Sequence, residues 1–298
     1  MVYTTQAATL EPYAFWKAHP GCVHALLPLG EAAALSLSSD ALALHTAGGV
    51  PRMRMERRPR KGAADAAAAA AAAAAPEEDW LCCALEPGQG QSRVLVGGSG
   101  GGVTTVDLVG SKRAGQADVA KEGVVAIKAP PGRGLLVMGT EGGRVLLGDA
   151  RRGVKVDHTA LAHPGGLACL DARADMVVTC GYGVRMGQTV PDNTVRVFDL
   201  RYSLRPLFAL TAPAPVAVAW HPQLPMGVVV ASADGSFCVA DVSNPAAAHN
   251  YQVADLASVA PAPRSFVSMH AWGPAAQRAP FVSSLVRRGS GPGLAAAS

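Results

Sequence analysis

Short apolar runs separated by turn residues recur along the chain, and they recur in the same order. Each unit holds three runs that are rich in Val and Leu and are bounded by Gly, Pro, Asn or Asp. Runs of this kind are typical of β-strands packed inside a sheet. Four units are clear: LCCAL, RVLVGG and VTTVDLV; VVAIKA, GLLVMGT and RVLLGDA; LACLDA, MVVTCG and TVRVFDL; VAVAW, GVVVAS and SFCVAD.

The third run of each unit contains an aspartate that closes its strand, and a turn residue precedes this aspartate by six positions. Successive aspartates are 42, 50 and 42 residues apart, close to the roughly 40–45 residues of a WD-repeat blade. We assign the eight extra residues of the third unit to a loop in GYGVRMGQTVPD. The spacing predicts an all-β WD-repeat β-propeller, because one blade cannot bury both of its faces alone. The turn residues and aspartates are Gly101 and Asp107, Gly143 and Asp149, Asn193 and Asp199, and Gly235 and Asp241.

A weaker fifth unit precedes these four. In ALALHTAGGVPRMRM, Gly49 stands six residues before Met55 and so repeats the spacing from turn to strand. We therefore predict a lead-in segment over residues 1–30 and a weak first blade over residues 31–60. The clear blades occupy residues 80–245, and residues 246–298 are expected to hold a degenerate last blade and a flexible tail.

Residues 61–79 form an alanine-rich, low-complexity insertion between the weak blade and the clear ones. The ten consecutive alanines from Ala66 to Ala75 are too few for a membrane span, which needs about 20 residues. A short isolated helix is marginal in water. The pattern favours an exposed insertion, and no membrane contact is expected.

Composition supports a turn-rich β protein with a sizeable core. The chain has 298 residues, of which 49% are hydrophobic, with 33 Gly and 22 Pro. Its net charge of +4 does not by itself indicate a nucleic-acid partner. The six cysteines contain no C-x-x-C pair, and the N-terminus has no secretory signal pattern, so we expect reduced thiols and an intracellular protein.

No group of residues predicts catalysis, a metal site or a cofactor. The segment around Ser99 matches G-x-S-x-G, but a nucleophile elbow opens onto a helix and here another strand follows. His158 and His163 lie near Cys169, yet no second pair of ligands has zinc-like spacing. We interpret the first group as a turn and the histidines as blade-turn residues.

A basic run is the strongest electrostatic feature of the sequence. It could contact RNA phosphates or a partner, or act as a nuclear-import signal. No aromatic residue is interleaved to stack bases, and a solvated loop is the alternative. The residues of this run are Arg52, Arg54, Arg57, Arg58, Arg60 and Lys61.

The stretch from about Leu135 to Val253 resembles a known family. It contains GTEGGRVLLGD, VVTCGYGVR, DNTVRVFDLRYSLRPL, WHPQLP, VVVASADGSFCVAD and YQV. The CGYGVR segment before a VFDLR strand, and HPQLP two strands later, are more specific than a generic blade. The stretch is similar to the N-terminal WD-repeat domain of the catalytic subunit of the poly(A)-nuclease deadenylation complex.

This resemblance implies a seven-bladed propeller, of which about five blades are recognisable here. The small–Phe–Gly–Asp strand expected after YQV is missing, so an incomplete ring is expected. In the family, a linker that binds a regulatory partner, an inactive ubiquitin-hydrolase-like domain and a DEDD-type exonuclease follow the propeller. The sequence given stops before these parts, so the resemblance implies a non-enzymatic scaffold without catalytic residues or cofactors.

Two function classes follow from this reading. The first is a scaffold in poly(A)-tail shortening and mRNA decay, which contacts the regulatory subunit of the complex and poly(A) ribonucleoprotein. The second is an unrelated WD-repeat regulatory adaptor that docks peptide motifs. The resemblance implies a cytoplasmic location, with P-bodies or the nucleus as further options. The fold alone cannot decide, because propellers host many functions.

Overall fold

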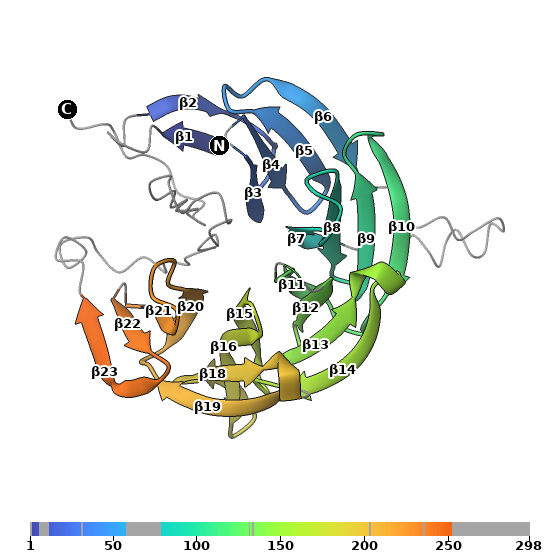
Figure 1. Ribbon diagram of the computed structural model, residues 1–298. Helices are drawn as coiled ribbons and strands as arrows, with labels where there is room; N and C mark the ends of the chain where they lie inside the picture. Colours follow the sequence, from blue (N-terminus) through green and yellow to red (C-terminus); the bar gives the residue numbers. More distant parts are fainter. Residues whose placement is uncertain are drawn as a thin grey trace.

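The computed structural model describes residues 2–5, 12–30, 32–57, 79–130, 132, 134–202, 204–234 and 236–251. Within these residues, five antiparallel sheets follow one another around a central axis as the blades of a β-propeller, and a two-stranded sheet precedes them (Figure 1). The predicted all-β propeller is confirmed.

The blades are numbered in chain order, and their strands are as follows. Blade one holds β3 (Ala25–Leu29), β4 (Ala33–Leu37), β5 (Ala41–Thr46) and β6 (Pro51–Glu56). Blade two holds β7 (Trp80–Leu85), β8 (Arg93–Gly98), β9 (Gly102–Asp107) and β10 (Lys112–Asp118). Blade three holds β11 (Val124–Lys128), β12 (Leu135–Thr140), β13 (Arg144–Asp149) and β14 (Lys155–Leu161), with the short 3-10 helix η1 (Ala150–Arg152) before β14.

Blade four is the largest of the five. It holds β15 (Gly166–Arg173), β16 (Met176–Arg185), β18 (Thr194–Asp199) and β19 (Arg205–Thr211), with the 3-10 helix η2 (Leu200–Tyr202) before β19. A further strand, β17 (Gln188–Pro191), pairs only with β16. Blade five holds β20 (Pro215–Trp220), β21 (Gly227–Ser232), β22 (Phe237–Asp241) and β23 (Asn244–Tyr251).

The hydrophobic cores lie between blades, because side chains alternate along each strand. In β12, Leu136 and Met138 pack with residues of blade two, whereas Val137 packs with residues of blade four. The same division occurs in β16, where Val177 faces blade three and Val178 faces blade five. The second strands of blades three and four are buried on both faces for this reason, and their apolar runs in the sequence reflect that burial.

One buried carboxylate also joins three inner strands. Asp171 of β15 accepts a hydrogen bond from the backbone N–H of Trp220 in β20, at 2.8 Å. The other carboxylate oxygen of Asp171 lies 3.4 Å from Nζ of Lys128 in β11. Asp171 is almost fully buried, so this carboxylate couples blades three, four and five close to the axis.

The turn residues of the repeat are explained by close backbone approach. Gly101 and Gly143 have φ of +81° and +78°, a region that favours glycine. A Cβ on Gly143 would lie 1.6 Å from the carbonyl oxygen of His163, and one on Gly101 would lie 2.1 Å from that of Ala120. Asn193 fills the equivalent place in blade four, where its Oδ1 accepts the N–H of Ala214. Gly235 lies outside the described residues.

The first blade is more regular than the sequence indicated, and its predicted alignment was wrong. The blade begins at Ala25, inside the predicted lead-in segment. Gly49, with φ +83°, turns the chain from the third strand into the fourth, so Met55 lies in the fourth strand and has no counterpart among the repeat aspartates. The equivalent third strand ends at Thr46. The spacing misplaced the unit because Gly49 precedes Met55 by the same six residues that separate turn and aspartate in the other units, although this turn joins β5 to β6.

The N-terminal sheet pairs β1 (Val2–Thr5) with β2 (Pro12–Trp16). It packs beside blade one, where Val2, Ala18 and Val23 form a small buried cluster against Trp16. The Trp16 ring lies 5.5 Å from the His45 ring, and a Cβ on Gly49 would lie 2.7 Å from it. Part of the predicted lead-in segment is therefore folded onto the propeller.

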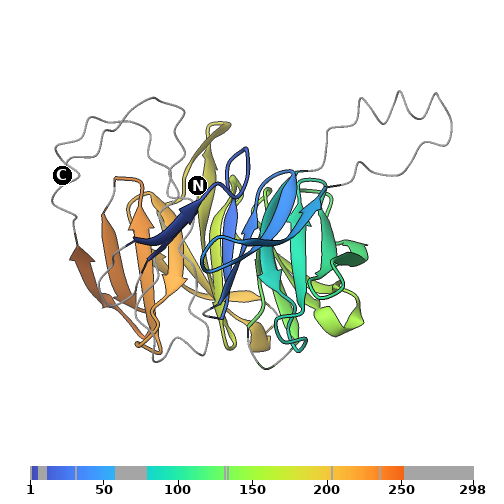
Figure 2. The ribbon, with the colours of Figure 1, turned by 90° about the horizontal axis from the view of Figure 1, so that it is seen from above.

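The extra residues of the third unit form a hairpin, where a loop was predicted. Strand β16 continues to Arg185, and β17 returns antiparallel to it after a turn at Met186 and Gly187, whose φ values are +50° and +76°. Two successive residues with positive φ are the requirement of a tight hairpin turn. Figure 2 shows this hairpin standing clear of one face of the disc.

The regular blades end later than the predicted boundary at residue 245. Residues 244–251 form β23, the fourth strand of blade five, so the regular blades continue past residue 245. The predicted tail from residue 252 onward, and the alanine-rich insertion over residues 61–78, lie outside the described residues.

Candidate functional site

The four repeat aspartates are structural, because each closes the turn that follows its strand. One carboxylate oxygen of each accepts the backbone N–H of the residue two positions later, at 2.8–3.0 Å. An aspartate that caps a turn in this way provides a hydrogen-bond acceptor for a backbone N–H of the turn that would otherwise lack one. The residues are Asp107, Asp149, Asp199 and Asp241, at the ends of β9, β13, β18 and β22.

Two of these aspartates also hold an arginine. Asp149 binds the guanidinium of Arg151 through both carboxylate oxygens, at 3.0 and 2.9 Å. Asp199 binds Arg201 in the same way. The hydrogen bond to Arg151 holds the pKa of Asp149 below its ordinary value. These carboxylates sit in separate blades, and the described residues contain no group of three or more His, Cys, Asp or Glu that could hold a metal ion.

His163 is a buried link within blade four. Its Nδ1 donates to Asp192 at 3.0 Å, and its Nε2 accepts from the hydroxyl of Thr179 at 3.0 Å. Burial lowers its pKa, against the raising effect of Asp192, so the ring is neutral at pH 7. His158 lies in the exposed outer strand β14. The interpretation of these histidines as blade-turn residues fits His163, which precedes β15, and was wrong for His158, which lies within β14.

A matching arrangement stands in blade one. His19 precedes β3, and its Nε2 lies 2.8 Å from Oγ of Ser36 in β4. Its Nδ1 lies 3.0 Å from Oγ of Ser38, whose hydroxyl donates to Asp40 at 2.6 Å. The sequence signal is a histidine before the first strand, a hydroxyl residue in the second, and an aspartate just before the third. Sequence reasoning missed this signal because the residues are far apart along the chain.

The remaining candidate nucleophiles, Ser99 and the adjacent cysteines, have structural roles. Oγ of Ser99 accepts the backbone N–H of Asp79 at 2.8 Å, in a turn between β8 and β9, as expected for a turn rather than a nucleophile. Cys82 and Cys83 alternate along β7, and burial raises both of their pKa values, that of Cys83 to about 12. A thiol with a raised pKa is a poor nucleophile at neutral pH.

The described part of the basic run lies on the outer strand of blade one. Arg52 and Arg54 are exposed on β6, and Arg57 follows the strand with its side chain 16% exposed, paired with Asp79 at 3.7 Å. Arg54 lies 3.6 Å from Glu56 and donates to the carbonyl of Ala18 at 3.4 Å. Arg58, Arg60 and Lys61 lie outside the described residues.

A neighbouring strand adds basic residues that the sequence analysis did not connect to this run. An open groove of about 780 Å³ separates the end of β6 from the start of β10 in blade two. Arg54 and Arg57 line it on one side, and Ser111, Lys112 and Arg113 on the other. Lys112 and Arg113 follow Arg54 by 58 and 59 residues in the chain, so only the fold brings them together.

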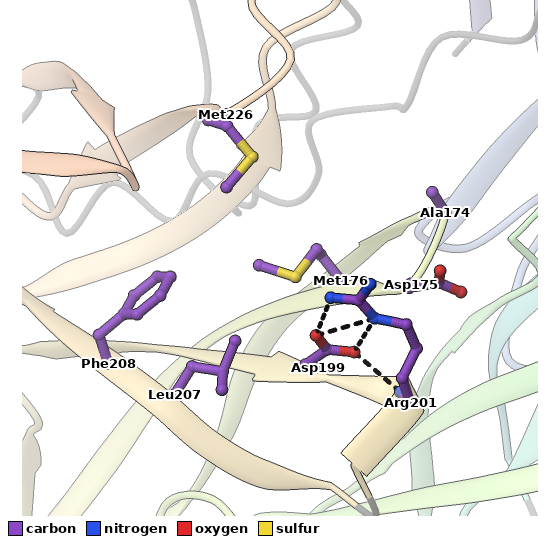
Figure 3. Close-up of a pocket in the computed structure, with 8 residues that line it drawn as sticks. All are labelled: Ala174, Asp175, Met176, Asp199, Arg201, Leu207, Phe208 and Met226. Carbon is purple, nitrogen blue, oxygen red and sulfur yellow. Dashed lines mark hydrogen bonds and ion pairs between the residues drawn. The ribbon is translucent and has the colours of Figure 1, made fainter.

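A second, apolar groove lies between blades four and five. It has a volume of about 350 Å³ and is lined by Met176, Leu207, Phe208 and Met226 (Figure 3). The paired Asp199 and Arg201 stand at the same groove, with their hydrogen bonds drawn in Figure 3. Leu207 is 45% exposed, so the groove is open to solvent.

Comparison with protein families gives a match over most of the chain. The model of the PAN2 N-terminal family matches residues 84–265. The PAN2–PAN3 deadenylation complex catalytic subunit of Schizosaccharomyces pombe is 33% identical over 120 residues, which is 40% of this chain and 11% of that protein. The corresponding protein of Yarrowia lipolytica is 26% identical over 215 residues, 72% of this chain and 19% of its own length. The matched region is thus a small part of these relatives.

Solved structures share the fold. The Pan2 WD40 domain of Neurospora crassa matches with a TM-score of 0.68 and 18% identity, over 85% of this chain and 73% of that chain. The structure of U3-55K matches with a TM-score of 0.61 and 15% identity, over 77% of this chain and 64% of that chain. Among the residues that the structure describes, no helix has the length and apolar character to cross a membrane.

Proposed function

The chain belongs to the PAN2 N-terminal family, and from this premise we propose that it is a non-catalytic propeller scaffold of a deadenylation complex, acting in the shortening of mRNA poly(A) tails. The family match over residues 84–265 carries this proposal. The described site supports it, because the repeat carboxylates cap turns in separate blades and are not gathered around one point.

The proposed role follows from how a propeller is built. Its interblade cores and the Asp171 link make a rigid disc, and its exposed strands and turns offer long rims to other proteins. A rigid surface loses little conformational entropy when it binds, which suits a scaffold. We assign this rim to contacts with a PAN3-type regulatory subunit and with poly(A) ribonucleoprotein.

Binding to the regulatory subunit tests this proposal. The chain is mixed with the PAN3-type subunit of the same organism, and their association is measured by isothermal titration calorimetry and size-exclusion chromatography. We expect weak, saturable binding through the propeller rim, because the linker that binds the regulatory partner in the resembling family follows the propeller. We expect an unrelated WD-repeat propeller of similar size to show none. Equal binding by the unrelated propeller, or no binding by this chain, would contradict the proposal.

A second assay tests the absence of catalysis. The chain is incubated with labelled poly(A) and Mg²⁺, and we expect RNA length to match a buffer control. A two-metal nuclease needs several carboxylates converging on one pocket, and the repeat aspartates each end a different blade strand. Trimming that disappears in Asp149→Asn or Asp241→Asn, with folding retained, would overturn the scaffold assignment.

The apolar groove between blades four and five favours a second candidate function, that of an adaptor docking short peptide motifs. Its methionine and phenylalanine lining could receive an apolar peptide side chain. This adaptor would bind peptides without any regulatory subunit of a deadenylation complex.

For the first function we propose a cytoplasmic location including P-bodies, which fluorescence microscopy of the tagged chain would test.

A further inference from the structure

The basic groove between β6 and β10 combines residues from two blades. Four of its lining side chains are cationic, Arg54, Arg57, Lys112 and Arg113, and one is anionic, Glu56. Ser111 adds a hydroxyl, at a turn position with φ +48°. The groove lies at the outer rim of the disc, where the fourth strands of blades one and two are neighbours (Figure 1).

One of these cations is held firmly in place. The guanidinium of Arg113 lies 5.5 Å from the centre of the Trp80 ring, and its NH2 group donates to the carbonyl oxygen of Glu56 at 3.2 Å. Trp80 itself is buried in the core between blades one and two. An arginine fixed between a ring and a carbonyl is preorganised, and preorganisation reduces the entropic cost of binding.

The carboxylates near the groove lie at long range from its other arginines. Glu56 lies 3.6 Å from Arg54, and Asp79 lies 3.7 Å from Arg57, both beyond good hydrogen-bond distance. Both side chains of the Arg54–Glu56 pair are exposed, at 41% and 76%, and exposed pairs of this kind contribute little. The side chain of Arg57 is only 16% exposed, so its pair with Asp79 is not of this kind. Asp107 faces Lys112 across the β9–β10 pair but is engaged in capping its own turn. An incoming anion can therefore replace the exposed Arg54–Glu56 pair.

The groove is suited to phosphate more than to a peptide. Guanidinium groups match the geometry of phosphate oxygens, and the hydroxyl of Ser111 can donate to them as well. Met55, which is half-buried, is the only apolar residue among those lining the groove, so an acidic peptide would find no pocket for its apolar side chains. No lining residue is aromatic, so bases would not be stacked there.

We propose that this groove binds the phosphate backbone of single-stranded RNA without base specificity. The choice of RNA rests on the proposed function, whereas the anion site rests on the groove itself. The site differs from the basic run predicted from sequence, because half of its cations come from blade two. It would hold a tail along the rim of the scaffold while other parts of a complex act on the RNA.

The test uses a double variant, Arg54→Gln with Lys112→Gln, which leaves Arg113 and its contacts intact. The matched control is Arg144→Gln with Arg152→Gln in blade three, where both arginines form long, exposed ion pairs. Both variants lower the net charge by the same amount. Fluorescence anisotropy measures the binding of labelled oligoadenylate and oligouridylate at several salt concentrations, with polyglutamate as a competitor.

We expect the groove variant to bind both RNAs about tenfold more weakly at about 50 mM salt. Its slope of log affinity against log salt should be about 1.4 smaller in magnitude, from two lost contacts to single-stranded RNA. The control should keep the parent affinity. Equal weakening by both variants would reduce the effect to net charge and overturn the site, and so would unchanged binding by the groove variant.

Two further outcomes separate this proposal from others. Polyglutamate that competes as strongly as RNA, per charge, would assign the groove to acidic proteins and overturn the RNA assignment. Substitution of Arg58, Arg60 and Lys61 could abolish RNA binding while the groove variant still binds RNA. That result would assign the RNA contact to the basic run alone and overturn the groove proposal. The groove variant should still bind the regulatory subunit, so failure of the scaffold function would appear separately.

Discussion

Nδ1 of His163 lies 3.0 Å from a carboxylate oxygen of Asp192, although the two residues are 29 positions apart. His163 stands before the first strand of blade four, and Asp192 stands just before its third strand. Thr179 of the second strand completes the link through Nε2. A fully buried histidine therefore fixes three segments of one blade.

Stability should fall on acidification below about pH 6.5 because of this histidine. Burial lowers the pKa of His163 from its ordinary value of 6.5. The unfolded chain takes up the proton near pH 6.5, whereas the folded chain resists it until a lower pH, so the contribution is complete above 6.5 and is lost as the pH falls below it. His19 and His45, whose pKa values burial also lowers, act in the same direction.

Urea unfolding between neutral and mildly acidic pH measures this effect. His163→Gln should be less stable at pH 7, yet its stability should depend less on pH than that of the parent. His158→Gln, at an exposed site, is the control and should keep the parent's pH dependence. An undiminished pH dependence in His163→Gln would show that this ring does not carry the effect.

Gly143→Ala should prevent folding or cost more than about 3 kcal/mol. The new Cβ would meet the carbonyl oxygen of His163 at 1.6 Å, in a backbone with positive φ. Gly153→Ala is a matched control, because Gly153 also has positive φ but nothing lies within 4 Å of the added Cβ. It should cost only about 1 kcal/mol. Similar losses in the two variants, measured by chemical denaturation, would refute the steric explanation.

Asp171→Ala should destabilise the propeller by about 2–4 kcal/mol. The change leaves the N–H of Trp220 without its acceptor and Lys128 without its ion pair. Asp157→Ala removes a more exposed carboxylate that lies 3.7 Å from Arg152, and should cost less than about 0.5 kcal/mol. Equilibrium urea unfolding decides between these expectations, and a neutral Asp171→Ala would show that the inner strands do not need this link.

Thiol labelling should distinguish one cysteine from the others. Cys22 is exposed, whereas the other five cysteines are buried or half-buried, and burial raises their pKa values. We expect a single rapid reaction with a thiol reagent in the native protein, and Cys22→Ser should remove it. Denaturant should make all six cysteines reactive. Rapid native labelling of Cys82 would mean that the core between blades two and three opens readily.

The sequence was a good guide to the buried strands and a poor one to the outer strands. The second strand of blade three is mostly apolar because it faces two cores, with Leu136 and Met138 in one and Val137 in the other. Strand β10, with the sequence KRAGQAD, is largely exposed and carries no apolar pattern to detect. The same weakness misplaced Gly49, since only the fold shows that it leads into a fourth strand.

The candidate sites depended on contacts that sequence spacing does not contain. Lys112 and Arg113 join Arg54 only because blades one and two are neighbours around the axis. The repeat aspartates could be aligned from spacing, but their capping of turns, and the arginine held by Asp149, appear only in the structure. The sequence repeat predicts the strands within each blade, but it does not predict which residues of neighbouring blades meet at the surface.

The sharing of each core by two blades has a consequence for local opening. If blade three detaches, both the core containing Leu136 and the core containing Val137 are exposed to water. If blade five detaches, the described residues lose a single core, the one containing Val230. Amide hydrogens should therefore exchange more slowly in β12 than in β21, and protection should decline from the middle of the array toward its last blade.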